Sequence, residues 1–234
     1  MKDISILIVL LTLSVSSSAH NYVPNYSFEL HHGCPDFYNQ VDSAIGWHRS
    51  FQNNNFTHHT DYLNACGSNY GLDYFTVPNN LLGYQVASTG ESYMCMATTA
   101  PTVYTDYREN FYCQLIQPLT VGVTYFVSFK VSKSNRTQNA TNRIGIKFST
   151  DTVFAINNIC QLSADSVVKN ITNWVNISGT FVADSAYNYL RVGNFFSDSN
   201  TIFQTICPSC PRPESEYYVD DICVHGNEAF DCSY

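Results

Sequence analysis

Two cysteines near the C-terminal end of the chain have a spacing that can perform redox chemistry. Cys207-Pro208-Ser209-Cys210 is a C-x-x-C motif, the spacing of thiol–disulfide oxidoreductases. In those enzymes the motif lies near a βαβ unit, whereas here prolines surround it between two expected strands. The sequence therefore predicts a structural disulfide, either within the motif or from one of its cysteines to Cys160.

Four carboxylates could supply the acid and base pair with which glycosidases cleave a glycosidic bond. A chain with 19 acidic residues offers such pairs by chance, and spacing selects none of them. The sequence contains no nucleophile-elbow, zinc-protease or phosphate-loop motif. We therefore predict that the protein is not an enzyme, with a hydrolase of unrecognised site as an alternative. The four carboxylates are Asp73, Glu91, Asp106 and Glu109.

Composition limits the compartment and the partners of this chain of 234 residues. A net charge of −8 argues against nucleic-acid binding, which depends on Lys and Arg contacts to phosphate. Lys2, the apolar run 4–13 and small residues up to Ala19 predict a signal peptide over residues 1–19, too short to span a membrane. We expect residues 20–234 to form one secreted domain. Its nine cysteines are an odd number, so a disulfide-linked dimer is possible.

The elements that must position any site are strands. Alternation of apolar and polar residues recurs over the ranges 124–132, 143–148, 175–182, 188–196 and 218–224, with polar turns between them. One apolar face per strand is typical of an antiparallel sandwich. The sequence predicts an all-β fold of two antiparallel sheets, with long loops over residues 33–84 at one end.

Short motifs at both ends of the chain support a more specific interpretation. Asn25-Tyr26-Ser27-Phe28-Glu29 near the start and Tyr218-Val219-Asp220-Asp221-Ile222 near the end resemble the jelly-roll carbohydrate-binding modules with a galactose-binding-like fold. Between them, the chain is similar to secreted lectin-like domains of gliding, biofilm-forming bacteria. The segments that carry this second likeness include His32-Gly33-Cys34-Pro35, Ile45-Gly46-Trp47, Asp61-Tyr62-Leu63-Asn64-Ala65-Cys66, Val77-Pro78-Asn79-Asn80, Gly83-Tyr84-Gln85 and Gly193-Asn194-Phe195.

The resemblance implies a jelly roll whose first and last strands are joined by a structural calcium ion. Calcium takes 6–8 oxygen ligands, and Glu29, Asp220 and Asp221 would supply the carboxylates. Carbonyls near Asn25 and in the loop 88–91 would complete the shell. Strand alternation puts Asp220 on the face of the core, where a carboxylate needs a partner or a metal, so we expect it to be the inner ligand.

The resemblance also implies a non-catalytic, lectin-like function toward an extracellular glycan or glycoprotein. Aromatic rings bind the apolar face of a sugar, and planar polar groups contact its hydroxyls. A structural or adhesive protein that binds other proteins through the same loops is an alternative. The ligand-binding candidates are Tyr70, Tyr74, Phe75 and Tyr84 in the loops and Tyr189 and Arg191 on a strand.

The cysteines and the glycosylation sequons complete the predictions. The resemblance implies a Cys34–Cys66 bridge, and Cys95–Cys113, Cys207–Cys210 and Cys223–Cys232 are pairs that sequence alone does not fix. This scheme leaves Cys160 unpaired, with Cys232 as the other candidate. Sequons that could carry glycans are at Asn55, Asn135, Asn139, Asn170 and Asn176.

Overall fold

The computed structural model describes residues 20–50, 60–68, 74–100 and 105–226 of the chain. The predicted signal peptide 1–19 lies outside these residues, as do Asn55, Tyr70, Asp73 and Cys232. In the described part of the chain, no helix is long and apolar enough to cross a membrane.

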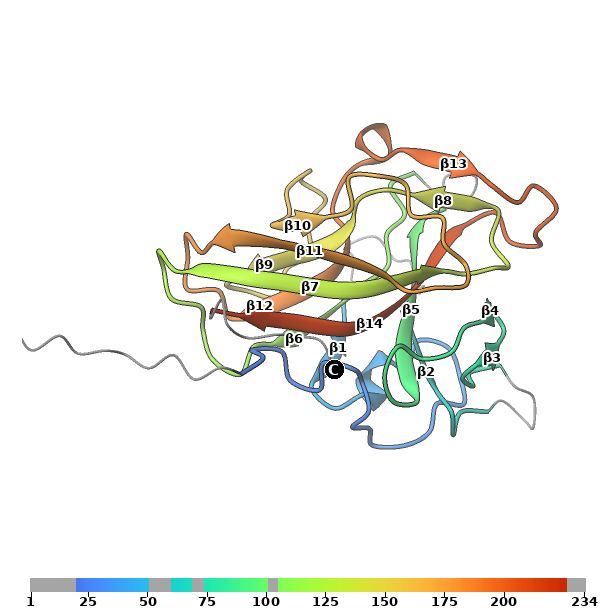
Figure 1. Cartoon of the computed structure of the whole chain (residues 1–234), viewed down its shortest axis with the longest axis horizontal. Helices are drawn as coiled ribbons and strands as arrows, with labels where there is room; N and C mark the ends of the chain where they lie inside the picture. The colour runs from blue at the N-terminus through green and yellow to red at the C-terminus, as the bar shows by residue number, and fades with distance from the viewer. Residues whose placement is uncertain (1–19, 51–59, 69–73, 101–104, 227–234) are drawn as a thin grey trace, which may run out of the picture.

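Two five-stranded antiparallel sheets stack face to face, as the alternation predicted (Figure 1). The first sheet contains, in spatial order, β1 (Trp47–Arg49), β6 (Asn110–Gln114), β12 (Tyr189–Asn194), β9 (Ile144–Ser149) and β10 (Leu162–Ser163). The second sheet contains β11 (Val175–Val182), β7 (Thr124–Lys133), β14 (Ser215–His225), β5 (Ser92–Thr99) and β2 (Asp61–Asn64). The fold is the predicted jelly-roll sandwich.

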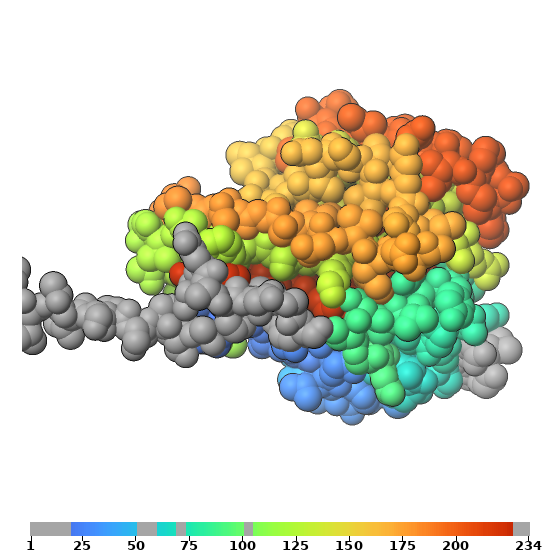
Figure 2. Space-filling view, in the orientation of Figure 1, coloured from blue at the N-terminus to red at the C-terminus, as the bar shows by residue number. Residues whose placement is uncertain are grey.

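Shorter elements lie outside the two sheets. Strand β13 (Phe203–Thr205) pairs with β8 (Asn139–Thr141), and β3 (Asn79–Asn80) pairs with β4 (Gly83–Tyr84). Two 3-10 turns, Val41–Ser43 and Asp198–Asn200, complete the elements. Figure 2 shows the N-terminal segments, coloured blue to teal, as a lobe along the lower edge of the sandwich.

The core lies between the sheets and consists of the apolar face of each strand. On β7 the predicted inward residues Tyr125, Val127, Phe129 and Val131 are all buried in it. A second, smaller cluster covers the opposite face of the second sheet, where the N-terminal lobe packs on it. Its members include Leu63, Phe75, Leu82, Tyr93, Cys95 and Tyr218.

One face of β14 differs from the prediction. Asp220 pairs with Lys130 and Cys223 with Ser128, so a bulge inserts an extra residue between these pairs. Asp221, in the bulge, has a left-handed φ of 50°. Because a bulge reverses the alternation, Ile222 reaches the core while Asp220 shares the outer face with Lys130. The prediction that Asp220 shares a face with Ile222 is therefore wrong.

Two of the predicted disulfides are confirmed and one is wrong. Cys34–Cys66 and Cys207–Cys210 are bonded. Cys223 is also disulfide-bonded, and Cys232, its expected partner, lies outside the described residues. Cys160 is a free thiol, as predicted.

The predicted Cys95–Cys113 bridge is wrong, since both residues are buried free thiols. They lie on consecutive strands, but β5 and β6 belong to different sheets. Cys113 points into the main core, whereas Cys95 belongs to the cluster on the outer face of the second sheet. The two thiols therefore lie on opposite sides of β5.

The sequons differ in accessibility. Asn135 and Asn176 are exposed and Asn170 is half-buried. Asn139 is buried, its amide nitrogen donates to the Pro213 carbonyl and its amide oxygen accepts from the Thr205 hydroxyl. Asn139 is therefore not available for a glycan in the folded protein.

Candidate functional site

A cleft opens on the outer face of the second sheet where its edge strand β2 ends. Pairing of β2 with β5 stops at Asp61 and Cys95, while β5 and β14 continue beyond that point. The volume of the cleft is about 400 Å³, within the range of small-molecule sites. We call it the carboxylate cleft; it is lined by Phe37, Tyr38, Asn39, Asp61, Leu82, Cys95, Met96, Ala97, Glu109, Arg212 and Glu216.

Glu109 contacts β5 beyond the point where its pairing with β2 stops, at Ala97. Its Oε2 accepts a hydrogen bond from the Ala97 amide at 2.8 Å, and its own amide donates to the Ala97 carbonyl at 3.0 Å. The Tyr107 hydroxyl donates to Oε1 at 2.6 Å. Backbone pairing therefore fixes this carboxylate, and the Asn39 amide fixes that of Asp61 through a 2.8 Å bond.

Arg212 and Glu216 form the opposite wall. The Arg212 Nη2 donates to Glu216 Oε1 at 2.9 Å, and its Nε lies 3.9 Å from Glu214 Oε2. The second oxygen of Glu216, Oε2, is buried and has no hydrogen-bond partner among the described residues. A buried carboxylate oxygen without a donor is unfavourable, so this atom is ready to accept one from a ligand.

The cleft holds its carboxyl groups in an environment that favours their protonated form. Burial raises the pKa of Asp61 well above its usual range, and the charge of Glu109 adds to the effect. Burial raises the pKa of Glu216 to about 7, although the Arg212 guanidinium lowers it. Burial also raises the pKa of the Cys95 thiol, so this cysteine is not a nucleophile at neutral pH.

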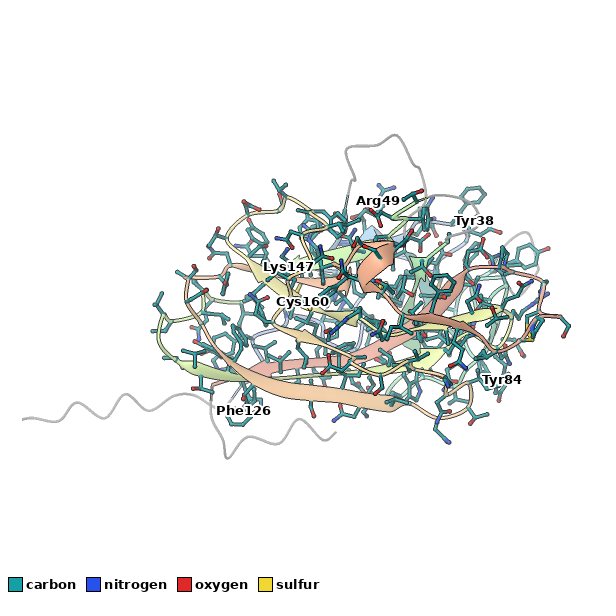
Figure 3. The ribbon with its side chains drawn as sticks, turned by 90° about the horizontal axis from the view of Figure 1, so that it is seen from above. Tyr38, Arg49, Tyr84, Phe126, Lys147 and Cys160 are labelled. Carbon is teal, nitrogen blue, oxygen red and sulfur yellow. A yellow bond between two sulfur atoms is a disulfide. The ribbon has the colours of Figure 1, made fainter. Side chains whose placement is uncertain are left out.

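Two aromatic rings stand at the rim of the carboxylate cleft. Phe37 and Tyr38 are 55% and 39% exposed, although both are large and apolar. Their rings pack edge-to-face, and Tyr38 packs in the same way on the buried ring of Phe75, with 5.0 Å between centroids. Figure 3 shows Tyr38 at the surface, toward the same end of the molecule as Tyr84. The rim therefore offers fixed aromatic surface next to buried polar groups.

The predicted ligand-binding residues are not brought together. Tyr74 and Tyr84 are exposed but do not line the cleft. Phe75 is 1% exposed, and its ring packs against the ring of Tyr38. Tyr189 and Arg191 lie on β12 in the other sheet.

Arg191 is buried, so its predicted role as an exposed sugar contact is not met. Its guanidinium lies over the Tyr112 ring and donates to Asn110 Oδ1 at 2.7 Å and to the Thr152 carbonyl at 2.6 Å. Arg191 is only 2% exposed, so its guanidinium offers no surface to a ligand.

The predicted calcium ligands meet at the loop 88–92. The Asp220 Oδ2 accepts hydrogen bonds from the amides of Ser88 at 2.9 Å and Thr89 at 3.3 Å. Asp221 accepts hydrogen bonds from the side-chain hydroxyls of Ser88 and Thr89 and, at 2.9 Å, from the ammonium of Lys130. We call this group the terminal clasp; it comprises Glu29, Lys130, Asp220, Asp221 and the loop 88–92.

Glu29 holds the other end of that loop. Its Oε1 accepts hydrogen bonds from the amides of Glu91 and Ser92, both at 3.0 Å. Gly90 has a left-handed φ of 63°, and a Cβ there would lie 2.3 Å from the Glu29 carboxyl carbon. The close approach of carboxylate and loop therefore requires glycine.

The chemistry of the terminal clasp suits a hard cation, but its carboxylates now accept hydrogen bonds from N–H and O–H donors. The terminal clasp has three carboxyl groups and one ammonium, and that ammonium pairs with Asp221. Burial together with the charge of Asp221 raises the pKa of Asp220 well above its usual range. The loop turns amides toward the carboxylates where carbonyls were expected. Among the described residues, no group of three His, Cys, Asp or Glu side chains is arranged to hold a metal ion.

No protein-family model and no curated protein matches the sequence. Several solved structures are similar to the chain. They include the xylan-binding domain of a Paenibacillus barcinonensis xylanase, with 10% identity, a TM-score of 0.39 and coverage of 86% of this chain and 90% of that one. The adhesin domain K1 of Lys-gingipain from Porphyromonas gingivalis has 13% identity and a TM-score of 0.43, over 86% of this chain and 96% of that one.

A larger protein is similar over part of its length. It comprises a carbohydrate-binding module and a glycoside-hydrolase module of a Clostridium thermocellum endo-1,4-β-D-xylanase in complex with xylohexaose. The identity is 14% and the TM-score 0.45, over 91% of this chain. The chain spans only 29% of the length of that xylanase structure.

Proposed function

We propose that the protein is a secreted, non-catalytic, lectin-like domain that binds an extracellular glycan in the carboxylate cleft. The observation that carries this proposal is the pairing of an exposed aromatic rim, Phe37 and Tyr38, with a buried Glu216 oxygen that has no hydrogen-bond partner in the described part of the chain. A sugar ring offers an apolar face to the first and hydroxyl groups to the second. The order of motifs along the sequence, which resembles carbohydrate-binding modules, supports the same function.

Extracellular location is part of this proposal. Residues 1–19 have the pattern of a signal peptide, and the two described disulfides suit an oxidising compartment. Cys160 has a free, half-buried thiol, and a disulfide-linked dimer would form through this residue.

Removing the rim tyrosine should weaken glycan binding. We expect Tyr38→Ala to lower the affinity for any glycan that binds the wild type by about tenfold, because one stacked aromatic ring contributes about 1 kcal/mol or more. A glycan array on the mature protein identifies the ligand, and titration calorimetry then compares the variants.

Tyr84→Ala is the matched control for this experiment. Tyr84 is 51% exposed but lies outside the cleft, so its loss should leave the affinity unchanged. The cleft would be the wrong site if Tyr84→Ala lost affinity and Tyr38→Ala did not. Absence of binding to every glycan would contradict the lectin function itself.

We propose calcium as a structural ion of the terminal clasp, held by Glu29, Asp220 and Asp221. The carboxylate oxygens and the excess of acidic groups support this, because calcium prefers oxygen ligands. For the ion to bind, the backbone amides and the Lys130 ammonium that now contact these carboxylates must move away. Its role there would be to join the N-terminal segment to β14, with no part in ligand chemistry.

Calcium should therefore raise the melting temperature. At a hundredfold excess over its dissociation constant the ion adds about 2.7 kcal/mol to the stability of the fold. Lys130→Met removes the competing ammonium, so we expect a larger calcium effect in this variant than in the wild type. Differential scanning fluorimetry with calcium and with a chelator measures both. Identical melting temperatures with calcium and chelator, in both proteins, would refute the calcium site.

A second function is favoured by one observation, the presence of Asp61, Glu109 and Glu216 in the same cleft. A carboxyl that remains protonated near neutral pH beside another carboxylate is the arrangement with which glycosidases supply a general acid. Release of reducing ends from a bound glycan by the wild type, lost in Glu216→Gln, would establish a hydrolase in place of a lectin.

A further inference from the structure

The carboxylate cleft has more carboxyl groups than cationic groups among the described residues that line it. Asp61 approaches from β2, Glu109 from the segment before β6, and Glu216 from β14. Arg212 is the only cationic side chain among the described residues that line the cleft. Its guanidinium is already engaged by Glu216 and lies near Glu214, so it does not neutralise the other two carboxylates.

One further cation lies near Glu216 outside the lining of the cleft. It is Lys133 at the end of β7, whose ammonium donates to the carbonyls of Ser134 and Thr137 and to the Thr137 hydroxyl. Tyr38, Cys95 and Tyr107 add no positive charge, and Glu214 is a further carboxyl group beside Arg212. Negative charge in a buried site is unfavourable unless a cation or a proton compensates it. In the free cleft protons supply this compensation, since the pKa values of Asp61 and Glu216 are raised, and a cationic ligand can replace those protons.

One atom shows where a donor from the ligand would bind. Glu216 is only 6% exposed and lines the cleft, and no described residue forms a hydrogen bond with its buried Oε2. A hydroxyl group could donate to it, but only a charged donor would also offset the excess of carboxylates. An ammonium group has three donors and no acceptor, which suits a pocket of carboxylate oxygens.

The aromatic rim fits the same kind of ligand. Phe37 and Tyr38 give an apolar surface for a pyranose ring, and the face of an aromatic ring also attracts a cation. A sugar that carries an amino group meets both requirements within one residue of the glycan.

We propose that the cleft recognises a glycan with free amino groups, such as an oligomer of glucosamine, through Glu216 and Asp61. This inference rests on the proposed function and narrows it to one class of sugar. N-acetylation removes the charge of the amine without changing the ring, so the acetylated oligomer is the matched neutral ligand.

The test compares binding of the glucosamine hexamer, the N-acetylglucosamine hexamer and cellohexaose by titration calorimetry at neutral pH. We expect the wild type to bind the glucosamine hexamer at least about tenfold more tightly than either neutral hexamer. Glu216→Gln and Asp61→Asn retain the shape of the cleft and remove a carboxyl group that could ionise to pair with the ligand's ammonium, so both should reduce this ratio several-fold. Asp165→Asn, which removes an exposed carboxylate, should leave it unchanged.

Each outcome decides a separate point. Equal or tighter binding of a neutral hexamer would overturn the amino-sugar inference and leave the lectin function intact. Equally tight binding of a lysine hexamer would overturn the choice of a glycan, since the ammonium alone would then suffice. Binding of none of these oligosaccharides, and of no glycan on the array, would overturn both proposals.

Discussion

Replacing Cys34 and Cys66 together by serine is expected to lower the free energy of unfolding by about 4 kcal/mol. The two cysteines are bonded across a sequence separation of 32 residues, and cross-linking a loop of that length removes much entropy from the unfolded chain. Urea unfolding of the mature protein without reductant, followed by tryptophan fluorescence, measures the change.

The Cys207–Cys210 pair is the matched control. Its sequence separation is only 3, so the same double replacement should cost about 2 kcal/mol. Equal losses for the two pairs would contradict the loop-entropy explanation.

The same bond should also matter for binding. Phe37, Tyr38 and Asp61, which line the carboxylate cleft, all lie between Cys34 and Cys66. We expect the double replacement to weaken glycan binding even where the protein remains folded, because the rim loses its fixed position.

The second large effect is a loss of stability as the pH rises. The pKa of Glu216 is raised from 4.5 to about 7 in the folded protein, so the folded state binds its proton more tightly than the unfolded state does. A carboxyl group of this kind stabilises the fold at low pH, and the contribution disappears as the pH rises through 7. Between pH 5 and pH 8 the loss from Glu216 is about 2–3 kcal/mol. Asp61, whose pKa is also raised, acts in the same direction.

Denaturant unfolding at a series of pH values tests this expectation. Glu216→Gln should be more stable than the wild type at pH 8 and should show a smaller dependence on pH. Asp165→Asn, with an exposed carboxylate, should retain the full dependence. A wild-type stability that is constant or increases from pH 5 to pH 8 would show that Glu216 is ionised throughout.

Local patterns were sufficient for the strands of the sandwich. The alternation in 124–132 predicted both the strand β7 and its inward residues, and the range 175–182 coincides with β11. A strand that is buried on one face must alternate with a period of two, so its sequence alone reports the orientation of its side chains. The sequence resemblance likewise identified the Cys34–Cys66 bond.

The same rule failed on β14, where backbone geometry intervened. A bulge at Asp221 changed the face of Ile222 relative to Asp220, and nothing in the alternation of that segment signals it. The prediction of a Cys95–Cys113 disulfide was wrong for a related reason, since the order of two strands along the chain does not say whether they share a sheet.

The carboxylate cleft was decided by the tertiary structure alone. Glu109 was among the acidic residues that the sequence offered, but Asp61, Arg212 and Glu216 were not selected, and Tyr38 was missed in favour of other loop aromatics. Spacing along the chain carries no information on which strands become neighbours, and these residues come from segments up to 178 positions apart, from Tyr38 to Glu216. From the sequence we could predict an all-β sandwich with the disulfides Cys34–Cys66 and Cys207–Cys210. Only the pairing of β2, β5 and β14 placed three carboxyl groups and one guanidinium beside two exposed rings, because burial and charge depend on neighbours in space.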